Sequence, residues 1–193
     1  SAEASQLGSF TAEAFNGYEV SQFREAFELI ENVSGLRFVQ TFNYSNADMR
    51  LMMDTNEFFF GDLGAMIPAG EPGAGFGVFN GLSWDRGAGG DLEQGGFSFV
   101  TIVHELLHGL GLAHPHDRGG NSPVMTGVFS DFDDTGTYGL NQGVYTTMTY
   151  NSGLYESAGV GQQVGSQLTW GYESGPMALD IAVLQEKYGA NTR

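Results

Sequence analysis

The sequence predicts an α+β fold, because helical and extended patterns both occur along its 193 residues. In residues 18–33, apolar side chains recur every three or four positions with charged ones between them, which is typical of an amphipathic helix. Short apolar runs separated by glycines fill residues 58–96 and indicate strands joined by turns. Residues 97–110 are a second helix candidate, so we expect two helices beside a small sheet.

The remaining elements follow from shorter patterns. Residues 115–175 show little periodicity and are expected to be irregular, and a loop of that length is usually functional. The last helix is expected over residues 176–188, with Pro176 at its start and Gly189 just past its end. The strand candidates are residues 36–42, 47–53, 58–60, 65–67 and 77–79.

The composition favours a globular acidic protein and excludes two classes of partner. Hydrophobic residues make up 41% of the chain, which is enough to bury a core. Seven basic against 23 acidic residues give a net charge of −16, and such a surface repels nucleic acid and anionic membranes. No apolar run approaches the roughly 20 residues that span a bilayer. Cysteine is absent, so any metal must be held by imidazole and oxygen ligands.

Residues 104–114 read His-Glu-Leu-Leu-His-Gly-Leu-Gly-Leu-Ala-His, and they form the predicted zinc site. His104 and His108 are four positions apart, so both rings leave the same face of a helix. Gly111 can take a positive φ, end the helix and turn the chain back, so that His114 supplies a third nitrogen. Three neutral histidines leave a fourth position for water, which is the arrangement of a catalytic zinc site.

Glu105 is the candidate general base, since it follows His104 and can reach a zinc-bound water without being a ligand. Such a water has a pKa of about 7, and Glu105 would take its proton during attack on a peptide carbonyl and pass it to the leaving amine. The alternative is a set of satisfied or surface histidines, which the spacing of the motif disfavours. His116 lies beyond the motif and is interpreted as an ordinary loop histidine.

The extended motif resembles that of the metzincins, and further segments resemble the serralysin family of secreted bacterial proteases. His114-Pro115 matches the end of the family's motif. Residues 145–150, Tyr-Thr-Thr-Met-Thr-Tyr, look like its Met-turn, and residues 176–191 resemble the helix that closes its catalytic domain. The resemblance covers most of residues 18–191 and implies a secreted zinc endopeptidase.

The resemblance also implies an architecture and a way of binding substrate. Residues 1–193 would form one metzincin catalytic domain, with a twisted mixed sheet and two helices in an upper lobe of about residues 1–114. A smaller irregular lobe of about residues 115–193 would end in a helix. The partner is expected to be a protein or peptide that lies extended along an edge strand near residues 63–67, and the enzyme is expected to be a monomer.

Three further residues receive roles from the resemblance. Met148 would form an apolar floor below the histidines, which agrees with the usual packing role of methionine. Tyr150 would be an additional ligand in the resting enzyme and would then hydrogen-bond the oxyanion, the alternative being a packed tyrosine. Asp180 would accept hydrogen bonds from the Met-turn backbone, the alternative being a carboxylate that the helix dipole favours.

Other interpretations stay open beside this one. The chain could be a non-catalytic zinc-binding or adhesion domain, which has no need of Glu105, or a metzincin of another family such as the matrixins. Residues 131–136 begin like a calcium loop, but position twelve is Gln142 in place of a bidentate glutamate, so a plain acidic turn competes with a calcium site. The glycine-rich calcium-binding repeats of serralysins do not occur in the sequence, and we therefore expect it to correspond to the catalytic domain alone.

Overall fold

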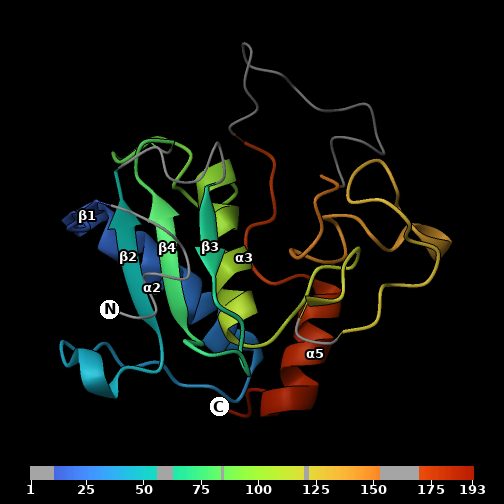
Figure 1. Cartoon of the computed structure of the whole chain (residues 1–193), viewed down its shortest axis with the longest axis horizontal. Helices are drawn as coiled ribbons and strands as arrows, with labels where there is room; N and C mark the ends of the chain where they lie inside the picture. Colours follow the sequence, from blue (N-terminus) through green and yellow to red (C-terminus); the bar gives the residue numbers. More distant parts are fainter. Residues whose placement is uncertain (1–10, 56–62, 84, 120–121, 153–169) are drawn as a thin grey trace.

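A small mixed sheet and three α-helices make up the described part of the fold, which is α+β as predicted (Figure 1). The structure is a computed structural model. It describes residues 11–55, 63–83, 85–119, 122–152 and 170–193.

The sheet has four strands in the order β1-β2-β4-β3. β1 (Ala12–Glu13) pairs antiparallel with β2 (Arg50–Asp54), and β2 runs parallel to β4 (Phe76–Asn80). β3 (Gly64–Met66) lies antiparallel to β4 at the far edge. All five residues of β4 are buried, because this strand has a partner on each side and side chains cover both of its faces. The predicted mixed sheet is therefore present, and β3 is one of its edges.

The first long helix, α2 (Gly17–Val33), begins at a capping box. The side chain of Asn16 accepts a hydrogen bond from the backbone N–H of Glu19, whose carboxylate accepts one from the backbone N–H of Asn16. Glu19 is fully buried, and the guanidinium of Arg86 donates to its carboxylate. This pairing keeps a charge inside the protein that would be costly to bury alone.

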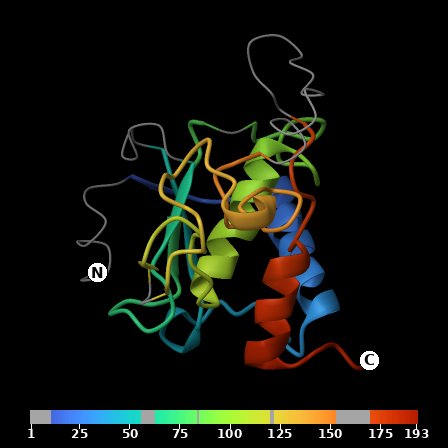
Figure 2. The same cartoon turned by 90° about the vertical axis from the view of Figure 1, so that its right-hand side faces the viewer.

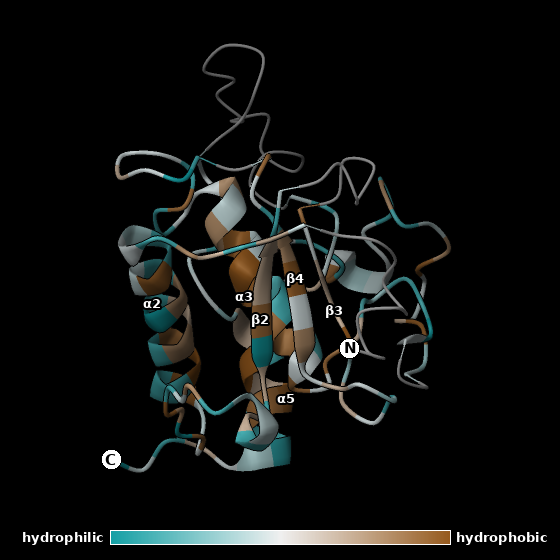
Figure 3. Ribbon diagram, turned by 60° about the vertical axis from the view of Figure 1, so that its left-hand side comes forward, coloured by the Kyte–Doolittle hydropathy of each residue, from teal (hydrophilic) through white to brown (hydrophobic). Residues whose placement is uncertain are grey.

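The helix α3 (Phe97–Gly109) lies with α2 on one face of the sheet, as Figures 1 and 2 show. Figure 3 shows α3 as largely hydrophobic, whereas α2 carries hydrophilic and hydrophobic residues in turn. The two helices and the sheet enclose the main core, whose buried members include Phe23, Ala26, Ile30, Met53, Phe79, Phe99, Ile102, Val103, Leu106 and Leu107.

Beyond α3 the described chain is mostly irregular until the last helix, α5 (Ala178–Tyr188). In Figure 1 this irregular part and α5 lie on the side of α3 opposite the sheet. The hydroxyl of Tyr188 donates to the carbonyl of Leu110 at 2.8 Å, and the side-chain amide of Gln185 donates to the carbonyl of Val33 at 2.9 Å. These bonds tie α5 to the C-terminal ends of both other helices.

The strand predicted over residues 36–42 is wrong, because this segment is irregular. The ring of Phe38 packs on that of Phe27 in α2, with centroids 4.6 Å apart. The apolar side chain of this segment is therefore buried by a helix and not by a sheet. The strand predicted over residues 47–53 begins only at Arg50. The candidate strand at residues 58–60 lies outside the described residues.

One helix boundary and one strand also differ from the prediction. The last helix begins at Ala178 and not at Pro176, because Met177 has an extended backbone and caps the helix. β1 (Ala12–Glu13) was not predicted, since a strand of two residues shows no alternation that a sequence pattern could reveal. Within the described residues, no helix has the length and apolar character that crossing a membrane requires.

We expect Leu106→Ala to lower the free energy of unfolding by about 2–5 kcal/mol, because truncating a fully buried leucine leaves a cavity. Leu82→Ala is the matched control, since Leu82 is 56% exposed and the same change there should cost less than about 0.5 kcal/mol. Denaturant unfolding followed by circular dichroism measures both losses. Equal losses would contradict the central position of α3 in the core.

Candidate metal centre

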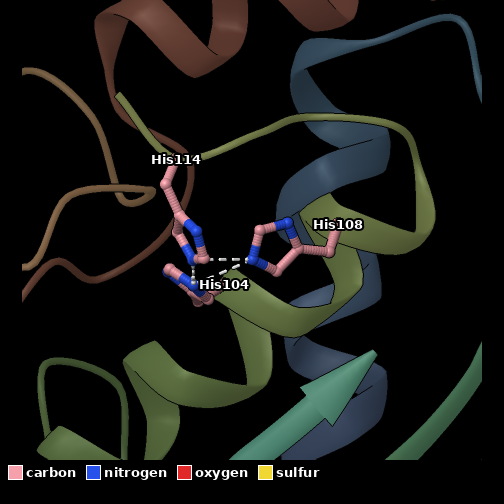
Figure 4. Close-up of side chains that lie close together, drawn as sticks. All are labelled: His104, His108 and His114. Carbon is pink, nitrogen blue, oxygen red and sulfur yellow. Dashed lines mark hydrogen bonds between the residues drawn. The ribbon is translucent and has the colours of Figure 1, made fainter. Parts of the chain in front are cut away.

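Three histidine rings point at one another beside the C-terminal end of α3 (Figure 4). His104 and His108 lie one turn apart on this helix, and His114 follows in the segment that turns back over them. The Nε2 atoms are 3.1 Å apart for His104 and His108, 3.0 Å for His104 and His114, and 2.9 Å for His108 and His114. The structure thus brings the three predicted ligands together.

The return of the chain depends on Gly111. Its φ is +84°, in the left-handed region that side chains disfavour, and its backbone N–H donates to the carbonyl of His108 at 2.8 Å. A Cβ atom at this position would lie 2.9 Å from Nζ of Lys187. The flexible end of Lys187 could move away, so the positive φ is what favours glycine here, as the sequence predicted.

The other ring nitrogen, Nδ1, faces in each histidine an oxygen that can only accept a hydrogen bond. The acceptors are the carbonyl of Thr147 for His104 at 2.8 Å, the carbonyl of Leu112 for His108 at 2.9 Å and the carboxylate of Asp117 for His114 at 2.6 Å. Each Nδ1 is therefore placed to carry a proton, which leaves a lone pair on Nε2 in the neutral form of the ring.

Three lone pairs directed at one point repel each other unless a cation lies between them. Protonation of His104 or His108 does not resolve this, because burial holds the pKa of His104 well below its usual range and lowers that of His108 to about 4. A tetrahedral metal ion at about 2.0–2.1 Å from each nitrogen would separate the nitrogens by roughly 3.3 Å. The observed separations of 2.9–3.1 Å are close to this value, so the residues fit a metal ion held by imidazoles.

Glu105 is buried on the same helix, next to the first histidine of the site. Its side chain runs beside the edge strand, since a Cβ atom at Gly64 of β3 would lie 3.0 Å from Cγ of Glu105. The glycine leaves space that a larger residue would fill. The side chain of the predicted base therefore extends from α3 toward the edge of the sheet.

Asp180 joins the last helix to the site. Its buried carboxylate accepts hydrogen bonds from the backbone N–H of Thr147 at 2.7 Å, from the hydroxyl of Thr146 at 2.6 Å and from the backbone N–H of Met177 at 2.9 Å. Burial raises the pKa of Asp180, against the opposing effect of these bonds. Because the carbonyl of Thr147 accepts a hydrogen bond from His104 Nδ1, Asp180 positions the backbone that orients one of the three converging rings.

Met148 is buried in the main core, and Tyr150 lies at the site itself. The ring centroid of Tyr150 is 4.8 Å from that of His114 and 6.0 Å from that of His104. The structure thus places both residues of the Met-turn that the resemblance singled out, one in the core and one beside two of the histidines.

His116 differs from its interpretation as an ordinary loop histidine. Its ring stacks on that of His114 with centroids 4.8 Å apart and an angle of 9°, and it also contacts the ring of Tyr150 at 4.5 Å. Burial lowers the pKa of His116. The residue therefore borders the candidate metal site.

The proposed calcium segment, residues 131–136, contains a hydrogen-bonded turn. The carboxylate of Asp134 accepts bonds from the backbone N–H groups of Phe129 at 2.6 Å and Gly136 at 3.1 Å. These bonds lower the pKa of Asp134. An acidic turn accounts for this residue without an ion.

The chain has several relatives among known proteins, although no family model matches it. It is 29% identical to the metallopeptidase AprA of Pseudomonas marginalis over 184 residues, which are 92% of this chain and 35% of that protein. It is 28% identical to serralysin C of Dickeya chrysanthemi over 183 residues, 92% of this chain and 34% of the relative. It is 34% identical to a serralysin of Proteus mirabilis over 100 residues, 52% of this chain and 18% of the relative.

The chain is a relative of the serralysin-type metalloproteases. The resemblance stated from its motifs is confirmed. The chain spans between 18% and 35% of the length of the three relatives described.

In this serralysin relative, Asp117 is a site residue that the sequence analysis missed. Its carboxylate accepts hydrogen bonds from Nδ1 of His114 at 2.6 Å and from the backbone N–H of Gly119 at 2.7 Å. Burial alone would raise the pKa of Asp117, but these bonds lower it. A carboxylate behind a metal-facing imidazole orients the ring and increases its basicity. The available signal was an acidic residue three positions after the last histidine of the motif.

A cavity of about 780 Å³ opens beside His108 and His114. Its rim includes Lys187, the single lysine of the chain. Its walls are mixed, and their apolar members include Met66, Leu112, Val124, Met125, Leu179 and Val183. A side chain of a bound polypeptide could therefore be buried next to the candidate metal site.

We expect Asp117→Asn to weaken metal binding about 10–100-fold, because the neutral amide holds the Nδ1 proton of His114 less strongly than a carboxylate does. Titration calorimetry with zinc measures the dissociation constant. Glu25→Gln is the control, since it removes the same charge from an exposed position of α2 and should leave the affinity unchanged. Wild-type affinity in Asp117→Asn would show that the carboxylate does not support the ligand.

Proposed function

We propose that the chain is the catalytic domain of a secreted, monomeric zinc endopeptidase with the metzincin fold. The observation that carries this proposal is the convergence of three imidazole lone pairs beside a buried glutamate at the sheet edge. The names of the relatives, metallopeptidase and serralysin, support the same class of reaction. In this proposal residues 1–114 and 115–193 form an upper and a lower lobe of one domain.

Zinc is the proposed ion, since three neutral histidines and one open position are typical of its catalytic sites. When bound, zinc supplies a Lewis acid that polarises the peptide carbonyl and lowers the pKa of a water to about 7. The role of the histidines is to hold it without adding charge. The hydrogen bonds from their Nδ1–H groups to oxygens keep the rings in one tautomer and one orientation.

Glu105 is the proposed general base. Its carboxylate accepts a proton from the attacking water and delivers it to the nitrogen of the leaving amine as the C–N bond breaks. The burial of Glu105 on the same helix as His104 and His108 supports this role, and Gly64 leaves space for its side chain at the sheet edge. A domain that only stored zinc would have no use for this arrangement.

The substrate is proposed to be a polypeptide bound along β3. Among the described residues this strand pairs only with β4, so its other edge can accept an extended chain as a further strand. A chain bound there would pass Gly64, against which Glu105 lies. The cavity beside His108 would receive one of its side chains. The net charge of −16 favours neutral or basic substrates over nucleic acid or anionic membranes.

Glu105→Gln should retain the metal and the fold but lose several orders of magnitude in kcat, because the amide is nearly isosteric and cannot accept the proton. Casein digestion, metal analysis and circular dichroism measure the three properties. Wild-type protein treated with a strong chelator should be inactive and recover when zinc is added. Proteolysis that persists in metal-free protein would overturn the proposed mechanism.

Tyr150→Phe should lower kcat by about 10²–10³ with little change in KM, because its phenol is proposed to donate to the oxyanion that forms in the transition state. Metal content should stay unchanged, since the three histidines remain. Steady-state kinetics on a peptide substrate separate kcat from KM. A fully active variant would mean that Tyr150 only packs against the histidines.

A further inference from the structure

Two rings outside the set of metal-facing histidines contact Tyr150. The ring of Phe132 lies 5.5 Å from that of Tyr150 at an angle of 28°, and the ring of His116 lies 4.5 Å from it at 49°. The two residues come from different parts of the irregular chain that follows α3. Nothing in the proposed chemistry requires either of them, so their position needs a separate explanation.

Both rings are only partly covered by the rest of the chain. Phe132 is 59% exposed, so much of its ring surface is not covered by the fold. Nδ1 of His116 is buried and has no hydrogen-bond partner within the described part of the chain. The interaction that both residues make with Tyr150 is therefore a contact between aromatic rings.

Ring contacts of this kind limit the positions that the side chain of Tyr150 can take. It is 41% exposed on an irregular segment, where an aromatic side chain can exchange between staggered rotamers. A phenol that serves a reaction must be held within about 0.5 Å of its working position by its neighbours. Rings that contact Tyr150 from Phe132 and His116 reduce the number of rotamers it can adopt.

We propose that Phe132 and His116 are positioning residues that hold the ring of Tyr150 beside His114. Only the catalytic consequence of this placement rests on the proposed function; the placement itself does not. The two ring contacts restrain the phenol, while Asp180 separately accepts hydrogen bonds from the hydroxyl of Thr146 and the backbone N–H of Thr147.

The placement can be tested without any enzyme assay. Tetranitromethane modifies accessible tyrosine rings, and peptide mass spectrometry reports the rate at each site. In Phe132→Leu we expect nitration of Tyr150 to be at least threefold faster than in the wild type, with nitration of the 91% exposed Tyr138 unchanged as an internal reference. Phe129→Leu makes the same change at a 92% exposed side chain of the same loop and should alter neither rate. An unchanged rate at Tyr150 in Phe132→Leu overturns the proposal.

The catalytic consequence is tested by a double-mutant cycle. Phe132→Leu should lower kcat at least threefold with KM unchanged, and should have no effect when Tyr150→Phe has already removed the phenol. An equal loss in both backgrounds would show a merely structural effect and overturn the positioning role. If the chain proves to have no peptidase activity, the nitration result still decides whether Phe132 holds the ring.

His116 is tested by separating its ring from its nitrogens. His116→Phe keeps an aromatic ring and removes a buried nitrogen that has no partner in the described structure, so it should retain wild-type nitration of Tyr150 and wild-type kcat. His116→Ala should behave like Phe132→Leu, with metal content measured in both variants. A loss in His116→Phe as large as that in His116→Ala would show that a nitrogen, and not the ring, is what matters.

Discussion

The mutual repulsion of three imidazole lone pairs is the constraint on which the rest of the site depends. In each ring, the hydrogen bond from Nδ1 to an oxygen fixes the direction of the lone pair on Nε2. These oxygens belong to the Met-turn, to the segment that ends α3 and to the loop after the motif. The arrangement therefore requires three parts of the chain to be in place at once, and a cation at the point of convergence turns repulsion into attraction.

A buried carboxylate of the last helix supports this arrangement without facing the point of convergence. Asp180 belongs to α5, and its bonds to Thr146 and Thr147 hold the backbone whose carbonyl orients His104. Taking a carboxylate out of water is costly unless its oxygens are paired, and here three donors pair them. The last helix thus acts on the site through the Met-turn. None of its residues belongs to the group formed by His104, His108 and His114.

The predictions that failed were those in which a local pattern had a tertiary cause. Residues 36–42 alternate like a strand, but the apolar side chain of Phe38 packs against α2. Alternation reports that one side of a segment is buried, and it does not report whether a sheet or a helix buries it. β1 went unnoticed for the opposite reason, because two residues pair with β2 without any pattern of their own.

The sequence by itself determined the features that local geometry dictates. The spacing of His104 and His108, the turn at Gly111 and the helix over residues 18–33 follow from helix periodicity and from the freedom of glycine at positive φ. Only the tertiary structure decided that Asp117 supports His114 and that Phe132 and His116 contact Tyr150. Those contacts join positions with no periodic relation, and they form only because the irregular chain after α3 is folded back over the site.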